Sequence, residues 1–430
     1  MNEAPSEYID IRQLRIGLFI ELELGWMSHP FPTSSFKISS PKQIAVIKTL
    51  GLSRVRCVSG LSDPPDEAPQ MSAAAVSAGE ALVKQAGVDS ELLESKKQRQ
   101  EALAAQQRDL MVCERRFVES IRQYKQVLNQ LKSNPRSATA QSLALVTGLI
   151  DDMMGQGESS IRLLSEGMGD KAAMHPVNVT IISLLLGKTM ALPTAELIDL
   201  GVAAFLHDMG KTRLPDRVRL LDENFSTAEY KLYQEHVVEG SVLAKTMSLT
   251  VGARQAIAQH HELIDGSGFP THSKGDSLSK SAKILALVNR YDTLCNPGRS
   301  TAAITPHEAL SLIFAQLKSR YDAATLSAFI RMMGVYPPGS VVQLVDERFA
   351  IVVSVNSTRP LKPRLLVCEP GVPKDEALIL DLEWTPSIGI KRSLKPGLLP
   401  KAAFDYLSPR QRICYFFERI TVSEPAPVPT

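Results

Sequence analysis

The sequence predicts a mainly α fold: an all-helical bundle in the centre, a small α+β module before it and a short β-rich extension after it. Three observations carry this prediction. Residues 140–335 show helical apolar spacing almost throughout, residues 8–60 combine short β-like runs with one capped helix, and residues 341–355 hold two period-2 runs. A chain of 430 residues allows about two to four domains and a core that folds without disulfides.

The composition is that of an ordinary globular protein. Lys plus Arg is 48 and Asp plus Glu is 46, which argues against a polybasic nucleic-acid binder and against an acidic disordered protein. The five cysteines are scattered without a C-x-x-C pair, as expected for reduced thiols. The first residues, MNEAPSEYID, lack a signal-peptide pattern, and no apolar stretch is long enough to span a bilayer. We therefore expect a cytoplasmic protein with no membrane span and no DNA partner.

Residues 1–60 are expected to form the small α+β module. Ser40-Pro41 predicts a helix start, because Ser is a good N-cap and Pro suits the first turn, and the helix would stop at Gly51. Short β-like runs surround this helix, at 9–11, 17–22, 36–38 and 54–58. Residues 61–90 are rich in Pro, Ser, Asp and Ala and are expected to be a linker.

Residues 91–135 predict one long charged helix, with no Gly or Pro up to residue 133. A heptad-like stripe in steps of 4 and 3 runs along it and comprises Leu103, Gln107, Leu110, Glu114, Phe117, Ile121, Tyr124, Leu128 and Leu131. Two interpretations stay open. The helix packs on its own domain, or it forms a coiled coil that joins two copies into a homodimer.

Residues 336–420 are expected to be the β-rich extension. The period-2 runs at 341–345 and 349–355, joined at 346–348, predict a hairpin. Residues 421–430 end in EPAPVPT and are expected to be disordered.

The residues that carry chemistry lie in the central helical block. Six of the eight histidines fall between residues 175 and 272, most of them near the ends of predicted helices and close to carboxylates. The potential metal ligands are His175, His207, Asp208, His236, His260, His261, Asp265 and Asp292. A helix bundle builds a metal site from side chains on several facing helices, and mixed imidazole and carboxylate ligands suit iron, manganese or zinc.

The two adjacent pairs, His207-Asp208 and His260-His261, allow one point of the chain to serve two metals. A two-metal centre activates a bridging water and clamps the attacking and leaving oxygens of a phosphoester displacement. Lys211 follows the first pair and is placed to neutralise charge on a phosphate. Gly210 is expected to allow a sharp turn there.

These motifs resemble a known family. HDMGK at 207–211, HHE at 260–262 and DGSGFP at 265–270 are similar to the HD-GYP domain, a subgroup of the HD phosphohydrolase superfamily that typically hydrolyses the bacterial second messenger cyclic di-GMP. The resemblance covers residues 140–335. Residues 8–60, above all GWMSHPF at 25–31, resemble the uncharacterised domain that often precedes HD-GYP domains. The resemblance to the HD-GYP domain implies a metal-dependent cyclic di-GMP phosphodiesterase that releases linear pGpG, GMP or both.

The resemblance also implies roles for single residues. The metal ligands would be His175, His207, Asp208, His236, His260, His261 and the residue at position 289, Asn289. Lys211 would contact the scissile phosphate and act in catalysis with Asp208. The substrate would be bound by Lys211, Asp265, Gly266, Gly268, Phe269, Pro270 and Arg299. Two divalent ions are expected, iron or manganese before zinc, and loop 265–270 would also present a surface to diguanylate cyclase partners.

The chain departs from the family pattern at several positions. Phe269 replaces the signature Tyr, and Asn289 replaces an Asp that closes the ligand set. Arg299 is the single basic residue left in a segment where many members have several. Lys171 stands where an acidic residue would support a third metal, so at most two metals are expected.

Three functions follow from these features. The first is an active two-metal cyclic di-GMP phosphodiesterase. The second, which Asn289 favours, is a catalytically degenerate domain that binds cyclic di-GMP or a protein partner. The third is an HD phosphohydrolase acting on another nucleotide, and the Gly-rich turn at 265–270 argues against it.

Overall fold

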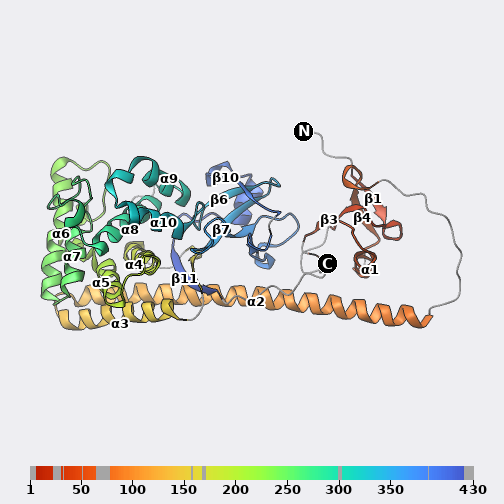
Figure 1. Ribbon diagram of the computed structural model, residues 1–430, viewed down its shortest axis with the longest axis horizontal. Helices are drawn as coiled ribbons and strands as arrows, with labels where there is room; N and C mark the ends of the chain where they lie inside the picture. The colour runs from red at the N-terminus through yellow and green to blue at the C-terminus, as the bar shows by residue number, and fades with distance from the viewer. Residues whose placement is uncertain are drawn as a thin grey trace. The chain divides into compact units, whose positions relative to one another are not determined.

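A computed structural model describes residues 6–22, 31, 33–50, 52–63, 78–155, 158–166, 171–298, 303–385 and 387–420, without the side chains of 78–96, 158, 171–172 and 419–420 (Figure 1). The chain divides into two compact units. Unit 1 comprises Met1–Arg108 and Cys368–Leu378, and unit 2 comprises Asp109–Val367 and Ile379–Thr430.

Unit 1 contains the predicted α+β module. Its antiparallel sheet has the order β1-β4-β2-β3, with β1 (Ser6–Asp10), β2 (Phe19–Glu21), β3 (Ser35–Lys37) and β4 (Arg54–Val58). Helix α1 (Pro41–Thr49) begins at the predicted cap, because Ser40 Oγ accepts from the Gln43 backbone N–H at 3.4 Å and Gln43 Oε1 accepts from the Ser40 backbone N–H at 3.2 Å. Short 3-10 helices complete the unit at η1 (Ile11–Gln13), η3 (Ser59–Leu61) and η9 (Lys374–Glu376).

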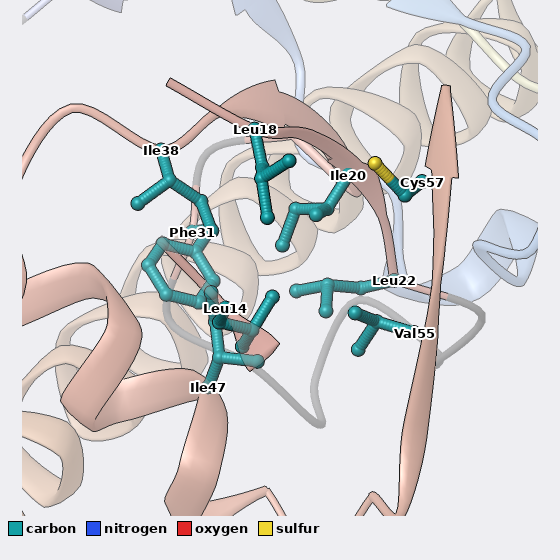
Figure 2. Close-up of a cluster of buried hydrophobic side chains, with 9 residues drawn as sticks. All are labelled: Leu14, Leu18, Ile20, Leu22, Phe31, Ile38, Ile47, Val55 and Cys57. Carbon is teal, nitrogen blue, oxygen red and sulfur yellow. The ribbon is translucent and has the colours of Figure 1, made fainter. Parts of the chain in front are cut away.

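The module has a hydrophobic core of its own (Figure 2). Side chains from the sheet, α1 and the connecting segments converge there: Leu14, Leu18, Ile20, Leu22, Phe31, Ile38, Ile47, Val55 and Cys57. Phe31 is the described residue of the GWMSHPF run, and residues 25–30 lie outside the description. Burial of this apolar surface is what stabilises so small a sheet.

The long helix α2 (Ala78–Gln130) begins earlier than predicted. Residues 78–90 of the expected linker are helical, because the run from Glu80 to Lys84 consists of good helix formers apart from Val83. Residues 64–77 of that linker and the expected tail 421–430 lie outside the description. The helix ends at Gln130, five residues before the predicted boundary at 135.

Within unit 2, the second half of the heptad-like stripe is buried in the domain itself. Phe117, Ile121, Tyr124 and Leu131 are at most 4% exposed. The Tyr124 ring meets the edge of the Phe205 ring at 5.2 Å between centroids. Glu114 interrupts the stripe because its carboxylate accepts a hydrogen bond from the Ser165 backbone at 3.1 Å. This half of the helix packs on its own domain, and the homodimer stays a prediction.

The helices of unit 2 confirm the mainly α fold. They are α3 (Pro135–Met154), α4 (Lys171–Thr189), α5 (Thr194–Leu206), α6 (Thr227–Thr246), α7 (Val251–Gln259), α8 (Lys280–Cys295), α9 (Pro306–Gln316) and α10 (Ala323–Met333). Short 3-10 helices lie between them, at η4 (Met209–Arg213), η5 (Asp216–Val218), η6 (Gly275–Ser277) and η8 (Lys318–Arg320). Helix α4 packs against both α5 and α8, and α5 packs against α7 (Figure 1).

A seven-stranded sheet completes unit 2, with the path β10-β6-β7-β5-β11 and with β8 joining β7 to β9. Its elements are β5 (Glu158–Leu163), β6 (Val341–Leu344), β7 (Phe349–Asn356), β8 (Arg364–Val367), β9 (Leu380–Asp381), β10 (Ile390–Leu394) and β11 (Tyr415–Ile420), with η10 (Pro396–Leu398) and α11 (Lys401–Leu407) between the last two strands. The predicted hairpin is β6–β7, in which Val342 pairs with Ala350.

Strand β5 corrects the expectation that residues 140–335 are wholly helical. It lies between β7 and β11, so its partners come from the C-terminal part of the chain. Ser160 and Arg162 are buried in it, and both pair with the carboxylate of Glu418 on β11. Ser160 and Arg162 alternate with apolar Ile161 and Leu163, but a run of this length is too short to stand out within a block of helical spacing.

The cysteines are free thiols, as predicted, and Cys368 alone of the five is not fully buried. Among the described residues, no helix combines the length and the apolar character needed to cross a membrane.

Substitution of Phe117 separates the two interpretations of the stripe. Phe117→Ala should lower the free energy of unfolding by about 3–5 kcal/mol, because it leaves a cavity in the core of unit 2. Met111→Ala, on the exposed side of the same helix, should change it by less than about 0.5 kcal/mol. Denaturant titration by circular dichroism measures both. An unfolding midpoint that depends on protein concentration in the wild type, and loses that dependence in Phe117→Ala, would contradict the intramolecular packing.

Candidate metal centre

Two overlapping groups of ligand atoms lie together in unit 2. One group comprises Asp208, His236, His260 and His261, and the other comprises His175, His207 and Asp208. Within each group, the ligand atoms all lie within 4.8 Å of one another. The structure therefore brings together the six histidine and aspartate residues that the family resemblance implies as ligands, whereas Asp265 and Asp292, also counted as potential ligands, belong to neither group.

Helix ends and one close backbone approach position these residues. His207 and His260 follow the last residues of α5 and α7, and α6 carries His236. Gly210 was expected to permit a sharp turn, but a Cβ atom at this position would overlap the backbone of His236 and Gly240. Glycine is needed here because η4 packs directly on the backbone of α6.

Three of the histidines are oriented by their own helices. His207, His236 and His260 each donate from Nδ1 to the carbonyl oxygen three residues earlier, at 2.5–2.7 Å. Because a carbonyl oxygen only accepts, Nδ1 carries the proton and Nε2 presents its lone pair. The Nε2 atoms of His236 and His260 then lie 3.3 Å apart, which suits two ligands of one ion.

His175 is oriented by a carboxylate instead. Asp292 Oδ2 lies 2.6 Å from His175 Nδ1, which leaves His175 Nε2 at 3.3 Å from His207 Nε2. The other oxygen of Asp292 accepts hydrogen bonds from Asn178 and Asn296. Asp292 was grouped with the potential ligands, and the structure places it behind a ligand, where it fixes the ring and its tautomer.

Asp208 belongs to both groups through different oxygens. Its Oδ1 lies 3.6 Å from His236 Nε2, whereas its Oδ2 lies 3.5 Å from His207 Nε2 and 3.6 Å from His175 Nε2. Lys211 Nζ donates to Oδ2 at 2.7 Å. A carboxylate placed in this way can bridge two ions.

The electrostatics of the centre favour metal binding. Burial lowers the pKa of His207 to about 4 and the pKa of His236 and His260 to about 3, so these imidazoles are neutral at physiological pH. Burial also holds the pKa of His261 well below its usual range. For Asp208, burial raises the pKa, but Lys211 and the neighbouring His207, His175 and His236 together outweigh burial and hold the pKa well below its usual range, so the carboxyl stays ionised. Neutral imidazole and ionised carboxylate are the forms that bind metals.

Two buried atoms in the centre have no hydrogen-bond partner among the described residues. They are Asp208 Oδ1 and His261 Nε2. Buried polar atoms in folded proteins are nearly always paired, and both of these atoms belong to the four-residue group. A divalent ion would satisfy both, so the residues present fit such an ion.

The loop after α7 packs directly on the centre. Phe269 stacks on the His261 ring with 4.4 Å between centroids and 18° between planes, and its N–H donates to the His261 carbonyl at 3.1 Å. A Cβ atom on Gly268 would lie 2.5 Å from the Glu262 Cα, so the loop can approach this closely only with glycine. The loop thus holds one face of the His261 ring.

Glu262 closes this loop, a role that the sequence did not reveal. Its buried carboxylate accepts from the Thr271 N–H at 2.6 Å, the Thr271 hydroxyl at 2.7 Å and the Ser273 N–H at 3.0 Å. These bonds span up to eleven residues. The HHE motif therefore joins two ligand candidates to the residue that fixes the neighbouring loop.

The remaining predicted site residues lie around this arrangement. Asp265 is exposed and accepts from Ser267 N–H and Oγ at 2.9 and 2.7 Å, within its own loop. Gly266 has a φ of +80°, and Pro270 follows Phe269. Asn289 is 5% exposed on α8, three residues before Asp292 and therefore on the same side of the helix. Arg299 lies outside the described residues.

Comparison with known proteins supports both predicted resemblances. Residues 161–325 match the HD domain family and residues 7–142 match a domain of unknown function, DUF3391. The cyclic di-GMP phosphodiesterase PA4108 of Pseudomonas aeruginosa is 24% identical over 84% of each chain. The cyclic di-GMP phosphodiesterase response regulator RpfG of Xanthomonas campestris pv. campestris is 28% identical over 47% of this chain and 56% of its own length. The 3'3'-cGAMP-specific phosphodiesterase 3 of Vibrio cholerae is 28% identical over 38% of this chain and 36% of its own.

The HD match encloses all six clustered histidine and aspartate residues, and the DUF3391 match runs from β1 through α2. Residues 161–325 of the chain are thus similar to the HD domain family, and the segment before them is similar to DUF3391.

Proposed function

We propose that this chain is a metal-dependent phosphodiesterase of HD-GYP type that hydrolyses cyclic di-GMP to linear pGpG, GMP or both. The observation that carries the proposal is Asp208, whose two oxygens face two groups of histidine nitrogens. Relatives named as cyclic di-GMP phosphodiesterases support the substrate, and one of them aligns over 84% of both chains. The chain is thus an enzyme of second-messenger turnover.

The proposed cofactor is a pair of divalent ions. Asp208, His236, His260 and His261 would hold one ion, and His175, His207, Asp208 and Asn289 would hold the other. An imidazole-rich set with one carboxylate favours iron or manganese, and then zinc, over calcium or magnesium. When bound, such ions supply Lewis acidity and a nucleophilic water for phosphodiester hydrolysis.

The protein itself contributes a fixed positive charge beside the centre. Lys211 Nζ lies 2.7 Å from Asp208 Oδ2 and 5.3 Å from the centre of the Tyr233 ring. Burial lowers the pKa of Lys211, but Asp208 and Tyr233 together outweigh burial and raise it, so the ammonium stays charged. A charge held in place before reaction stabilises negative charge that develops on a phosphoryl oxygen, and Lys211 is proposed for that role.

The loop residues Asp265, Gly266, Gly268, Phe269 and Pro270 are proposed to line the substrate entrance, and Arg299 is also proposed to bind the substrate. Phe269 already uses one ring face on His261, so a guanine base would meet its remaining exposed part. The same loop, exposed at Asp265 and Ser267, is the proposed surface for a diguanylate cyclase partner.

One residue favours the alternative, a degenerate domain that binds cyclic di-GMP or a protein without hydrolysis. Asn289 is neutral, so the three-residue group contains no anionic residue besides Asp208 among the described residues. An amide oxygen is a weaker metal ligand than a carboxylate. Turnover by the native chain decides between the two functions.

The first test is metal-dependent hydrolysis. Protein loaded with iron or manganese without oxygen should convert cyclic di-GMP to pGpG or GMP, measured by chromatography beside 3'3'-cGAMP. Asp208→Asn should reduce turnover to background and lower the metal content, because it removes the shared negative charge. Asp199→Asn, on α5 and hydrogen-bonded to Thr250, is the matched control and should stay active. No turnover by loaded wild type, with tight cyclic di-GMP binding, would favour the degenerate domain.

Substitution of Lys211 tests its role on the phosphate. Lys211→Met should lower kcat by roughly 100- to 1000-fold, as for loss of one preorganised donor, while metal content is retained. Arg213→Met is the control, because Arg213 lies on the same 3-10 helix but pairs with Glu239 at 2.6 Å. Equal losses in the two variants would exclude a specific role for Lys211.

Substitution of Gly268 tests whether the close packing of loop 265–270 on the centre matters for activity. Gly268→Ala should displace the backbone around His261 and cut kcat/KM by about 100-fold, since a shift of about 1 Å in a catalytic group has this effect. Ser267→Ala, at an exposed position next to it, should keep most of the activity. Steady-state kinetics with metal analysis measures both variants. An unchanged kcat/KM in Gly268→Ala would show that the close contact of Gly268 with the backbone after His261 does not affect catalysis.

A further inference from the structure

The two groups of the centre are unequal in ligands. The first offers four ligand residues, Asp208 with three histidines, whereas the second offers three and shares Asp208 with the first. Among the described residues, the smaller group has no His, Cys, Asp or Glu besides His175, His207 and Asp208. An ion in the first group would therefore gain more protein ligands than an ion in the second, where more coordination positions are left to be filled from elsewhere.

The unsatisfied atoms are distributed in the same unequal way. Asp208 Oδ1 and His261 Nε2 are buried without partners, and both belong to the larger group. The oxygen that serves the smaller group, Asp208 Oδ2, already accepts from Lys211 at 2.7 Å. An ion in the larger group would bind the two atoms that lack hydrogen-bond partners, whereas an ion in the smaller group would compete with the partly buried Lys211 ammonium for Asp208 Oδ2.

The charge of the centre also disfavours a second ion. Asp208 is the single anionic residue in either group, so two divalent ions and Lys211 would face one carboxylate. Asp292 does not supply a ligand oxygen, because its oxygens are engaged by His175, Asn178 and Asn296. Glu262 is engaged by Thr271 and Ser273. A second ion would therefore enter a buried centre with a large excess of positive charge, which is unfavourable at low dielectric.

Helix α8 offers a neutral side chain where a carboxylate would correct the excess. Asn289 lies three residues before Asp292, which contacts His175, and helical spacing places Asn289 and Asp292 on the same side of α8. Asn289 is buried, so its amide contributes no charge to the centre.

We infer that the four-residue group holds a resident divalent ion, and that the three-residue group takes up its ion together with the anionic dinucleotide. The inference rests on the proposed function for the identity of the anion. A cyclic dinucleotide has two phosphodiester groups, each with one negative charge, and supplies both the missing charge and the missing oxygen ligands. By linkage, the second ion must tighten dinucleotide binding by the same factor.

The test is equilibrium dialysis of the full chain against Mn²⁺, with metal per chain measured by mass spectrometry. The probe is a phosphorothioate analogue of cyclic di-GMP that resists hydrolysis. Without the analogue, the protein should hold about one Mn²⁺ tightly. With saturating analogue, it should hold two, with the affinity for the second raised by at least about tenfold, within the usual range of such couplings. Electron paramagnetic resonance should show a coupled manganese pair only with the analogue present.

Asn289→Asp is the diagnostic variant. The added carboxylate should allow two Mn²⁺ per chain without the analogue and reduce the effect of the analogue on the second ion. Asn224→Asp makes the same chemical change at an exposed position before α6 and should behave as wild type. If Asn289→Asp does not fold, the wild-type titration with and without analogue decides alone.

Failure of the inference and failure of the proposed function give different results. Wild type that hydrolyses cyclic di-GMP but holds two Mn²⁺ equally well with and without analogue would overturn the inference and leave the proposed function in place. The same holds for wild type that hydrolyses cyclic di-GMP and never exceeds one ion. Absence of hydrolysis, together with no effect of the analogue on metal content, would contradict the proposed function as well.

Discussion

The organisation of the centre depends on one buried carboxylate shared by two sets of histidines. Asp208 stands directly after α5, and its oxygens face opposite groups, so α4, α6 and α7 must all converge on the end of α5. That convergence explains why Gly210 cannot carry a side chain, since η4 has to meet the backbone of α6 for His236 to reach Asp208. The close packing of the helices is therefore what brings the ligand residues to Asp208.

The imidazoles are held in two ways, and the difference matters for the centre. His207, His236 and His260 are fixed by carbonyl oxygens of their own helices, so their orientation survives as long as each helix does. His175 is fixed by Asp292 from another helix, and its orientation depends on how α4 and α8 pack. The smaller ligand group thus has both fewer ligands and the one histidine that is held by a tertiary contact.

The sequence predicted what local signals determine. Ser40-Pro41 identified a helix start, the runs at 341–355 identified a hairpin, and clustered histidines identified the six residues of the centre. It missed β5 because Ser160 and Arg162 are satisfied by Glu418, more than 250 residues later in the chain. The roles of Asp292, Glu262 and Gly210 were missed or misread for the same reason: each depends on a neighbour that only the folded chain brings close.

The β-rich extension is joined to the centre through the same asparagines that hold Asp292. Asn178 Oδ1 accepts from the Tyr415 N–H at 2.8 Å, and Asn296 both accepts from the Ile413 N–H and donates to its carbonyl oxygen, each at 2.8 Å. The residues that fix Asp292, and through it His175, are thus fixed in turn by the segment that begins β11. Because β11 also pairs with β5 and accepts from Cys113 of α2 at Phe417, the C-terminal strand connects the long helix to the less complete half of the centre. The extension is therefore part of the framework that orients a ligand, and the HD helices alone do not account for the position of His175.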